Sequence, residues 1–278
     1  MSSAHGRIAI ERVQIRLGQG AQAFEALQEV SLDVAPGEFV CLLGPSGCGK
    51  STLLGALAGH LPPSAGTVCI DGQPVSGPEP SRGLVFQQHT LFPWQRVIDN
   101  VAFGLKMRGV PRSERRDQAR ALLASVGLAG FEDRYPSQLS GGMQQRVEIA
   151  RVLINQPHVL LMDEPFGALD ALTRVKMQQL LLQVWERIRT TVVFVTHDID
   201  EALFLADRIV MMSARPGRVV EQIVLPFERP RGASLVTDPA FVALKRRCLQ
   251  RLHGAEPLPR LSPLGTPPAE PAAWQFAI

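Results

Sequence analysis

The chain contains Gly44-Pro45-Ser46-Gly47-Cys48-Gly49-Lys50-Ser51, a stretch that fits the pattern G-x-x-x-x-G-K-[ST] of phosphate-binding loops. It follows a short apolar run, Phe39-Val40-Cys41-Leu42-Leu43, which predicts a buried strand. The motif therefore has the strand, loop and helix context that it requires. An ordinary glycine-rich turn before a helix is a much weaker interpretation.

Each part of this phosphate loop suits a nucleotide with Mg²⁺. Glycines let backbone N–H groups turn toward phosphate oxygens, and a helix that opens at Lys50 adds the positive end of its dipole. We expect Lys50 to reach the β- and γ-phosphates, Ser51 to offer its hydroxyl to Mg²⁺ and Thr52 to touch the α-phosphate. The predicted nucleotide-binding residues here are Gly44, Pro45, Ser46, Gly47, Cys48, Gly49, Lys50, Ser51 and Thr52.

A second apolar run, Val159-Leu160-Leu161-Met162, ends in the carboxylates Asp163 and Glu164. Asp163 is suited to hold Mg²⁺ through water, and Glu164 is suited to polarise an attacking water as general base. Two acids at the end of a strand can also serve only to cap it. The phosphate loop upstream favours the catalytic interpretation.

Between these two motifs stands Leu139-Ser140-Gly141-Gly142-Met143-Gln144-Gln145-Arg146. A serine N-cap and two glycines at an exposed helix N-terminus make a second anion site, one that a single copy of the chain leaves unfilled. A simple N-capped helix is the alternative, and it explains Ser140 but not the glycine pair.

The order of these motifs resembles that of the nucleotide-binding subunit of ATP-binding-cassette (ABC) transporters. The resemblance implies that Ser140, Gly141 and Gly142 bind the γ-phosphate of ATP held by an opposite subunit, so that two copies face head to tail. It also implies a glutamine loop at Phe86-Gln87, in which Gln87 senses Mg²⁺ and the attacking water. Asp170 of Ala168-Leu169-Asp170 then crosses the dimer interface, and His197 contacts the γ-phosphate. A lone histidine at a strand end is more often structural, but its place in this order favours the catalytic role.

One element of the family pattern is missing. Related proteins usually carry an aromatic residue that stacks on adenine near the end of the first strand, where this chain has Leu17. An aliphatic side chain lacks the stacking contribution of about 1–3 kcal/mol. Phe24 is a possible substitute, and the sequence leaves the base-stacking residue unassigned.

Composition is consistent with a cytoplasmic ATPase. The chain has 278 residues, 45% of them hydrophobic, and a net charge of only +3, so nothing in it calls for a nucleic-acid partner. No stretch approaches the ~20 apolar residues of a membrane span, and the N-terminus leads into no signal-peptide core. Four cysteines without a C-x-x-C pair favour a reducing compartment over disulfides or zinc.

The predicted fold is α/β, an ABC cassette of the phosphate-loop NTPase type with a mixed, mainly parallel sheet. Residues 1–92 hold an antiparallel β region, read as short segments, and the phosphate-loop part of the core. Residues 93–157 form an inserted helical subdomain with a helix from Ser113 to Val126. Residues 158–253 complete the core, with strands at 159–162, 192–196 and 208–212, a helix from Leu169 to Ile188 and a last helix from Pro239. Residues 254–278 form a proline-rich tail without predicted structure.

Short local sequences resemble those of the nitrate, sulfonate and taurine importer branch of bacterial ABC ATPases. They are most similar to its taurine and aliphatic-sulfonate members. These local sequences are Leu91-Phe92-Pro93-Trp94 and residues 163–170, 196–202 and 237–241. The resemblance implies an integral membrane permease that docks between Gln87 and Asn100, a periplasmic binding protein as indirect partner, and a place on the cytoplasmic face of the inner membrane. Trp94 is read equally well as an interface anchor or as core filling. Import of nitrate, bicarbonate or a pyrimidine precursor is the alternative within the family, and a soluble non-transport ABC ATPase is the alternative outside it.

Overall fold

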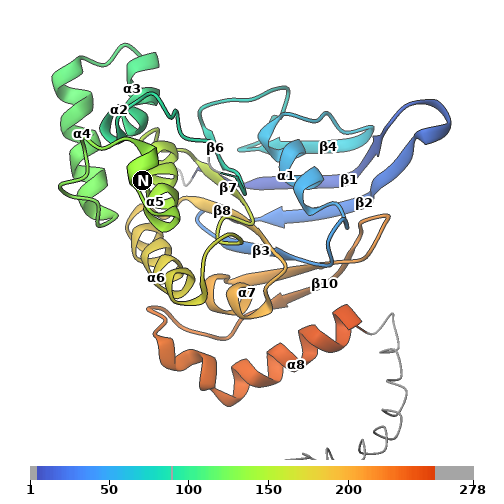
Figure 1. The fold of residues 1–278 in the computed structure, drawn as a ribbon. Coiled ribbons are helices and arrows are strands. Elements are labelled where there is room, and N and C mark those ends of the chain that lie inside the picture. The colour runs from blue at the N-terminus through green and yellow to red at the C-terminus, as the bar shows by residue number, and fades with distance from the viewer. Residues whose placement is uncertain (1–4, 89, 254–278) are drawn as a thin grey trace, which may run out of the picture.

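Two β-sheets face each other across helix α1 (Lys50–Ala58) in the computed structural model, which describes residues 5–88 and 90–253 (Figure 1). The larger sheet has six strands in the order β10-β9-β3-β8-β7-β6. All pair in parallel except β10, which runs antiparallel to β9. Its strands are β3 (Phe39–Leu43), β6 (Arg82–Val85), β7 (Val159–Asp163), β8 (Thr191–Thr196), β9 (Arg208–Met212) and β10 (Val219–Val224).

Strand β3 is apolar throughout because both faces of the large sheet are covered. Phe39, Cys41 and Leu43 point into a core shared with the helices, whereas Val40 and Leu42 point into the core shared with α1 and the smaller sheet. All five residues are fully buried. A strand covered on both faces has no need of polar alternation.

The smaller sheet is antiparallel, in the order β2-β1-β4-β5, as predicted for the N-terminal region. Its strands are β1 (Ile8–Leu17), β2 (Phe24–Val34), β4 (Ala65–Ile70) and β5 (Gln73–Pro74). The expectation of short segments was wrong, because β1 and β2 are long strands interrupted by register shifts. Arg12 and Glu29 take positive φ angles at these irregularities, which break the alternation that identifies a long strand.

Between β6 and β7 the chain forms helices, which lie together at one side of the sheets (Figure 1). The predicted helix over 113–126 is α4, displaced by a single residue. The predicted helix over 169–188 begins only at 171, because Asp170 is its N-cap and has an extended backbone. The helices after α1 are α2 (Val97–Val101), α3 (Phe103–Met107), α4 (Arg112–Ser125), α5 (Gly141–Leu153), α6 (Ala171–Ile188), α7 (Ile199–Leu205) and α8 (Pro239–His253), with short 3-10 turns η1 (Gly20–Gln22), η2 (Pro136–Gln138) and η3 (Ala233–Thr237).

The parallel strands bring the predicted site residues to one edge of the large sheet. Leu43 pairs with Thr196, and Asp163 pairs with Val195, so the loops after β3, β7 and β8 leave the sheet side by side. Open α/β sheets bind ligands at this carboxyl edge. None of the helices within 5–88 and 90–253 is both long and apolar enough to cross a bilayer. The predicted tail, 254–278, lies outside the described residues.

Candidate active site

The phosphate loop curls around the ammonium group of Lys50. Lys50 is buried, and its Nζ donates to the carbonyl oxygens of Gly44 at 2.8 Å and Pro45 at 2.9 Å. Gly49 precedes helix α1 with a φ of 96°, and a β-carbon there would lie 2.6 Å from Leu27 Cδ2. Both the left-handed backbone and the contact exclude other residues at this position. The helix therefore starts with its free N–H groups and Lys50 at one point, which suits a polyphosphate.

Ser51 and Asp163 meet at the mouth of this loop. Ser51 Oγ donates to Asp163 Oδ1 at 3.0 Å, although the two residues are 112 positions apart. Burial raises the pKa of the Asp163 carboxyl, and the hydrogen bond from Ser51 opposes that shift. A hydroxyl and a carboxylate oxygen at this separation are the donor set that Mg²⁺ prefers, so the residues present fit this ion.

Glu164 and His197 also come together. His197 Nδ1 lies 3.0 Å from Glu164 Oε2, and Glu164 has a φ of 43°, which is uncommon outside glycine. Gln87 belongs to the same corner. A β-carbon placed on Gly167 would lie 3.8 Å from Gln87 Nε2 and 4.0 Å from Glu164 Oε2. The structure thus gathers the three predicted catalytic side chains, and the strained backbone of Glu164 is typical of a functional position.

The predicted second anion site is formed at a different place. Ser140 caps α5, its Oγ accepting from the N–H of Met143 at 3.4 Å. Asp170 caps α6 in the same way, its Oδ1 accepting from Thr173 at 3.0 Å, and hydrogen bonds from Thr173 lower the pKa of Asp170. Within the described part of the chain, residues 139–146 do not line the cleft at the phosphate loop. That cleft is lined by Leu17, Phe24, Ala26, Ser46, Gly47, Gly49, Lys50, Ser51, Thr52, Glu164 and Arg215.

The glycine pair after Ser140 has two different explanations. A β-carbon on Gly142 would lie 2.6 Å from Thr173 Cγ2 of helix α6, so Gly142 is required by packing. A β-carbon on Gly141 would meet only Leu169 Cδ2, at 3.9 Å, which is an ordinary contact. Packing therefore accounts for one glycine, and the other leaves an open approach to the helix N-terminus.

Comparison with known proteins agrees with this geometry. The ABC transporter family profile matches residues 27–167. The taurine import ATP-binding protein TauB of Chromobacterium violaceum is 52% identical over 247 residues, which cover 87% of this chain and 94% of that protein. The chain belongs to the ABC transporter family. As a member it is an ATPase coupled to transport.

Two further relatives show how widely this ABC cassette is shared. An uncharacterized ABC transporter ATP-binding protein of Methanocaldococcus jannaschii is 54% identical over 228 residues, 82% of this chain and 84% of that protein. A dimeric post-hydrolysis structure of an ATP-binding cassette bound to ADP and Pi matches with a TM-score of 0.69 and 36% identity. It covers 80% of this chain and all of that one.

Arg215 lines the cleft at the phosphate loop, and the sequence interpretation missed it. Arg215 follows β9, and its Nε donates to the carbonyl oxygen of Gly47 at 2.9 Å while its guanidinium lies 5.0 Å from the centre of the Phe24 ring. Strand β9 is a parallel neighbour of β3, so the loop after it reaches the same edge as the phosphate loop. The signal available in the sequence was the Arg215-Pro216-Gly217 turn directly after the apolar strand at 208–212.

Leu17 and Phe24 are cross-strand partners at the ends of β1 and β2. The aromatic residue that the family pattern lacks at position 17 is therefore present directly opposite, and 42% of Phe24 is exposed. Phe24 and Arg215 together form one wall of the cleft beside Gly47.

Proposed function

We propose that this chain is the ATP-hydrolysing subunit of a bacterial importer, and that the importer carries taurine or aliphatic sulfonates. The observation that carries the proposal is a cluster of contacts beside the phosphate loop that holds Lys50. In this cluster Ser51 contacts Asp163, and Glu164 contacts His197. The substrate class is proposed from the local sequence similarities and from relatives whose names state taurine import.

ATP occupies the cleft with its phosphates on the loop. Lys50 and the backbone N–H groups of residues 44–52 hold the β- and γ-phosphates, and Thr52 contacts the α-phosphate. The adenine stacks on Phe24, whose ring also contacts the Arg215 guanidinium. Ser51, Asp163 and Gln87 would hold Mg²⁺, which would supply positive charge next to the phosphates when bound.

Glu164 acts as general base on the attacking water. Its carboxylate is oriented by His197, and Gln87 is close enough to position the same water. His197 can also reach the γ-phosphate, so the Glu164–His197 pair couples the state of the phosphate to the state of the base. Replacement of His197 by alanine lowers hydrolysis through a disordered Glu164 carboxylate.

A second copy of the chain completes each site. Ser140 and Gly141 present an exposed helix N-terminus to the γ-phosphate bound by the opposite subunit, while Asp170 lies at the interface between the copies. ATP binds the closed pair better than the open pair, and this difference in affinity drives the conformational change. The dimeric cassette with ADP and Pi supports this arrangement.

The permease docks on an aromatic groove beside the glutamine loop. Phe92 and Phe103 line this groove with ring centres 4.8 Å apart, and the ring of Trp94 lies 5.7 Å from that of Phe92. Trp94 is 72% exposed, so it does not fill the core, and this exposure supports a role as interface anchor. The cassette then lies at the cytoplasmic face of the inner membrane, and the periplasmic binding protein acts on it through the permease.

A chain of polar contacts links this groove to helix α5. Thr90 accepts through its carbonyl oxygen from Arg151 Nη1 at 2.8 Å, and its N–H and hydroxyl both donate to Glu148 Oε1. Glu148 and Arg151 belong to the helix that Ser140 caps. Movement of the permease is in this way transmitted to the second anion site.

The test is ATPase activity of the chain with its permease in liposomes and a loaded binding protein. Stimulation by taurine or an alkanesulfonate supports the proposal. Stimulation only by nitrate, bicarbonate or a pyrimidine precursor keeps the importer and changes the substrate. Activity that no permease affects favours a soluble ATPase. Trp94→Ala is expected to abolish stimulation but not basal hydrolysis, and Val224→Ala, equally exposed on β10, is the matched control.

A further inference from the structure

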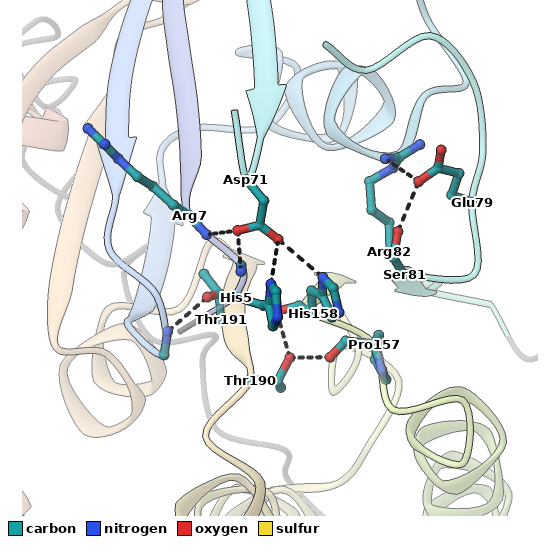
Figure 2. A network of polar contacts seen from close by, with 12 residues as sticks. His5, Arg7, Asp71, Glu79, Ser81, Arg82, Pro157, His158, Thr190 and Thr191 are labelled. Atoms are coloured by element: carbon teal, nitrogen blue, oxygen red, sulfur yellow. Dashed lines mark hydrogen bonds and ion pairs between the residues drawn. The ribbon is translucent and has the colours of Figure 1, made fainter. Parts of the chain in front are cut away.

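A second cluster of ligand-type side chains lies at the opposite end of strand β7 from the nucleotide site. His5, Asp71 and His158 come from three separate segments: the residues before β1, the turn between β4 and β5, and the residue before β7 (Figure 2). From His158 to Asp163 the chain advances five residues along a strand, or about 16 Å. The cluster is therefore independent of the ATP site.

The three side chains bring their ligand atoms close together. His158 Nδ1 lies 3.1 Å from Asp71 Oδ2, and His5 Nδ1 lies 3.8 Å from the same oxygen. All three ligand atoms lie within 4.8 Å of one another. The imidazole rings stack at 4.5 Å with an angle of 15°. A metal ion lies in the plane of each imidazole that binds it, so one ring must turn out of the stack when the ion binds.

These separations suit a small transition-metal ion. Tetrahedral Zn²⁺ with ligands at about 2.0–2.2 Å requires ligand atoms about 3.3–3.5 Å apart, and the two measured distances lie on either side of that value. The His5 side chain is 54% exposed, so it is the ring that can turn to complete the site.

The backbone holds the carboxylate and His158 in place. Asp71 Oδ1 accepts from the N–H groups of Gly6 at 2.6 Å and Arg7 at 3.0 Å, which leaves Oδ2 directed at the imidazoles (Figure 2). The N–H of His158 donates to Ser81 at 2.8 Å, and its carbonyl oxygen accepts from Thr190 Oγ1 at 2.9 Å. Such outer contacts orient the ligands of a metal site.

The electrostatics also favour a cation. Arg7, next to the cluster in sequence, directs its guanidinium to Asp33, with Nη2 2.8 Å from Oδ2. The Arg7 guanidinium therefore does not neutralise Asp71, whose charge is available to a metal ion.

We propose that His5, Asp71 and His158 bind one first-row divalent transition-metal ion, with Zn²⁺ the best match to two nitrogens and one carboxylate oxygen. Water completes the coordination. The ion joins the segment before β1 and the β4–β5 turn of the small sheet to strand β7 of the large sheet, so its binding stabilises the contact between the sheets.

The first experiment is calorimetric titration of ZnCl₂ into the full chain, freed of metal and held in excess Mg²⁺ and ADP so that the nucleotide site is filled. We expect one equivalent to bind with a micromolar or lower Kd and the thermal midpoint to rise. The Co²⁺ form is expected to show a four- or five-coordinate visible spectrum without thiolate charge transfer. The proposal would be overturned if no saturable binding occurred below about 1 mM Zn²⁺, because a structural metal site binds its ion more tightly than that.

Variants test the ligands one at a time. Loss of a residue that only orients a ligand typically costs about 10–100-fold in metal affinity, and loss of a ligand should cost more. His5→Gln and His158→Gln are therefore each expected to weaken Zn²⁺ binding at least about 100-fold. His60→Gln removes an exposed histidine after α1 and is expected to bind as the wild type does. If His158→Gln does not fold stably, the His5→Gln variant tests the proposal, because His5 is exposed. Wild-type affinity in His5→Gln would refute the three-ligand site.

Discussion

His197 Nδ1 lies 3.0 Å from Glu164 Oε2, and Glu164 holds this position with a left-handed backbone directly after strand β7. The contact joins residues 33 positions apart whose strands are neighbours in the sheet. This contact supports the proposal that Glu164 acts as general base and does not only cap the strand.

Glu164→Gln is expected to lower ATP hydrolysis about 10²–10⁴-fold, because an amide cannot take a proton from water. ATP affinity should be unchanged, since Lys50 and the loop remain. Steady-state hydrolysis and equilibrium binding of ATP measure the two effects. Hydrolysis at the wild-type rate would exclude Glu164 as the base.

Gly142→Ala is expected to destabilise the fold by about 1–3 kcal/mol, because the new methyl group meets Thr173 Cγ2. Gly141→Ala, one residue earlier, is the control and should leave the thermal midpoint nearly unchanged while it impairs hydrolysis by the dimer. Thr173→Ser removes the opposing methyl group and should rescue Gly142→Ala. Equal destabilisation by both alanines would refute the packing explanation.

Asp163→Asn is expected to raise the thermal midpoint at neutral pH. Burial raises the pKa of Asp163 above that of an unfolded aspartate, about 3.9, so the folded state binds the proton more tightly. The stability from this group is present at low pH, is lost as pH rises through the interval up to the raised pKa, and is lowest when Asp163 is ionised.

The measurement is thermal unfolding without nucleotide from about pH 4, close to the pKa of an unfolded aspartate, to about pH 8. The gain from Asp163→Asn should shrink toward the acid end. Asp117→Asn, on the exposed surface of α4, serves as the control and should show no such trend. A gain that is constant with pH would contradict the burial argument.

Phe24→Ala is expected to weaken ATP binding about 5–150-fold, the loss of about 1–3 kcal/mol of base stacking. Tripolyphosphate, which has no base, should bind the variant and the wild type equally. Phe24→Trp retains an aromatic face and should keep most of the ATP affinity. Equal losses for ATP and tripolyphosphate would mean that Phe24 supports the loop instead of the adenine.

Cys69 is expected to react with iodoacetamide before Cys48, although Cys48 lies in the phosphate loop. Cys48 is 1% exposed and burial raises the pKa of its thiol, whereas Cys69 is partly exposed. Mass spectrometry of tryptic peptides over a time course measures both. Loss of the fastest phase in Cys48→Ser instead of Cys69→Ser would contradict this order.

The sequence predicted the α/β core, the helices between 93 and 157 and the cap at Ser140, because these depend on residues adjacent along the chain. It did not predict the cap at Asp170, which was placed inside the helix. Phosphate loops, N-caps and apolar strands need only local spacing to be identified. The lengths of β1 and β2 were wrong because irregular pairing hid their alternation.

Contacts between distant segments depended on the tertiary structure alone. Phe24 stands opposite Leu17 because β1 and β2 pair in that register, and Arg215 reaches Gly47 because β9 lies beside β3. The same applies to Thr173 against Gly142. Local sequence therefore determined which chemistry this chain carries, and strand order decided which side chains share a site, since strand pairing and helix packing bring together residues that no local spacing connects.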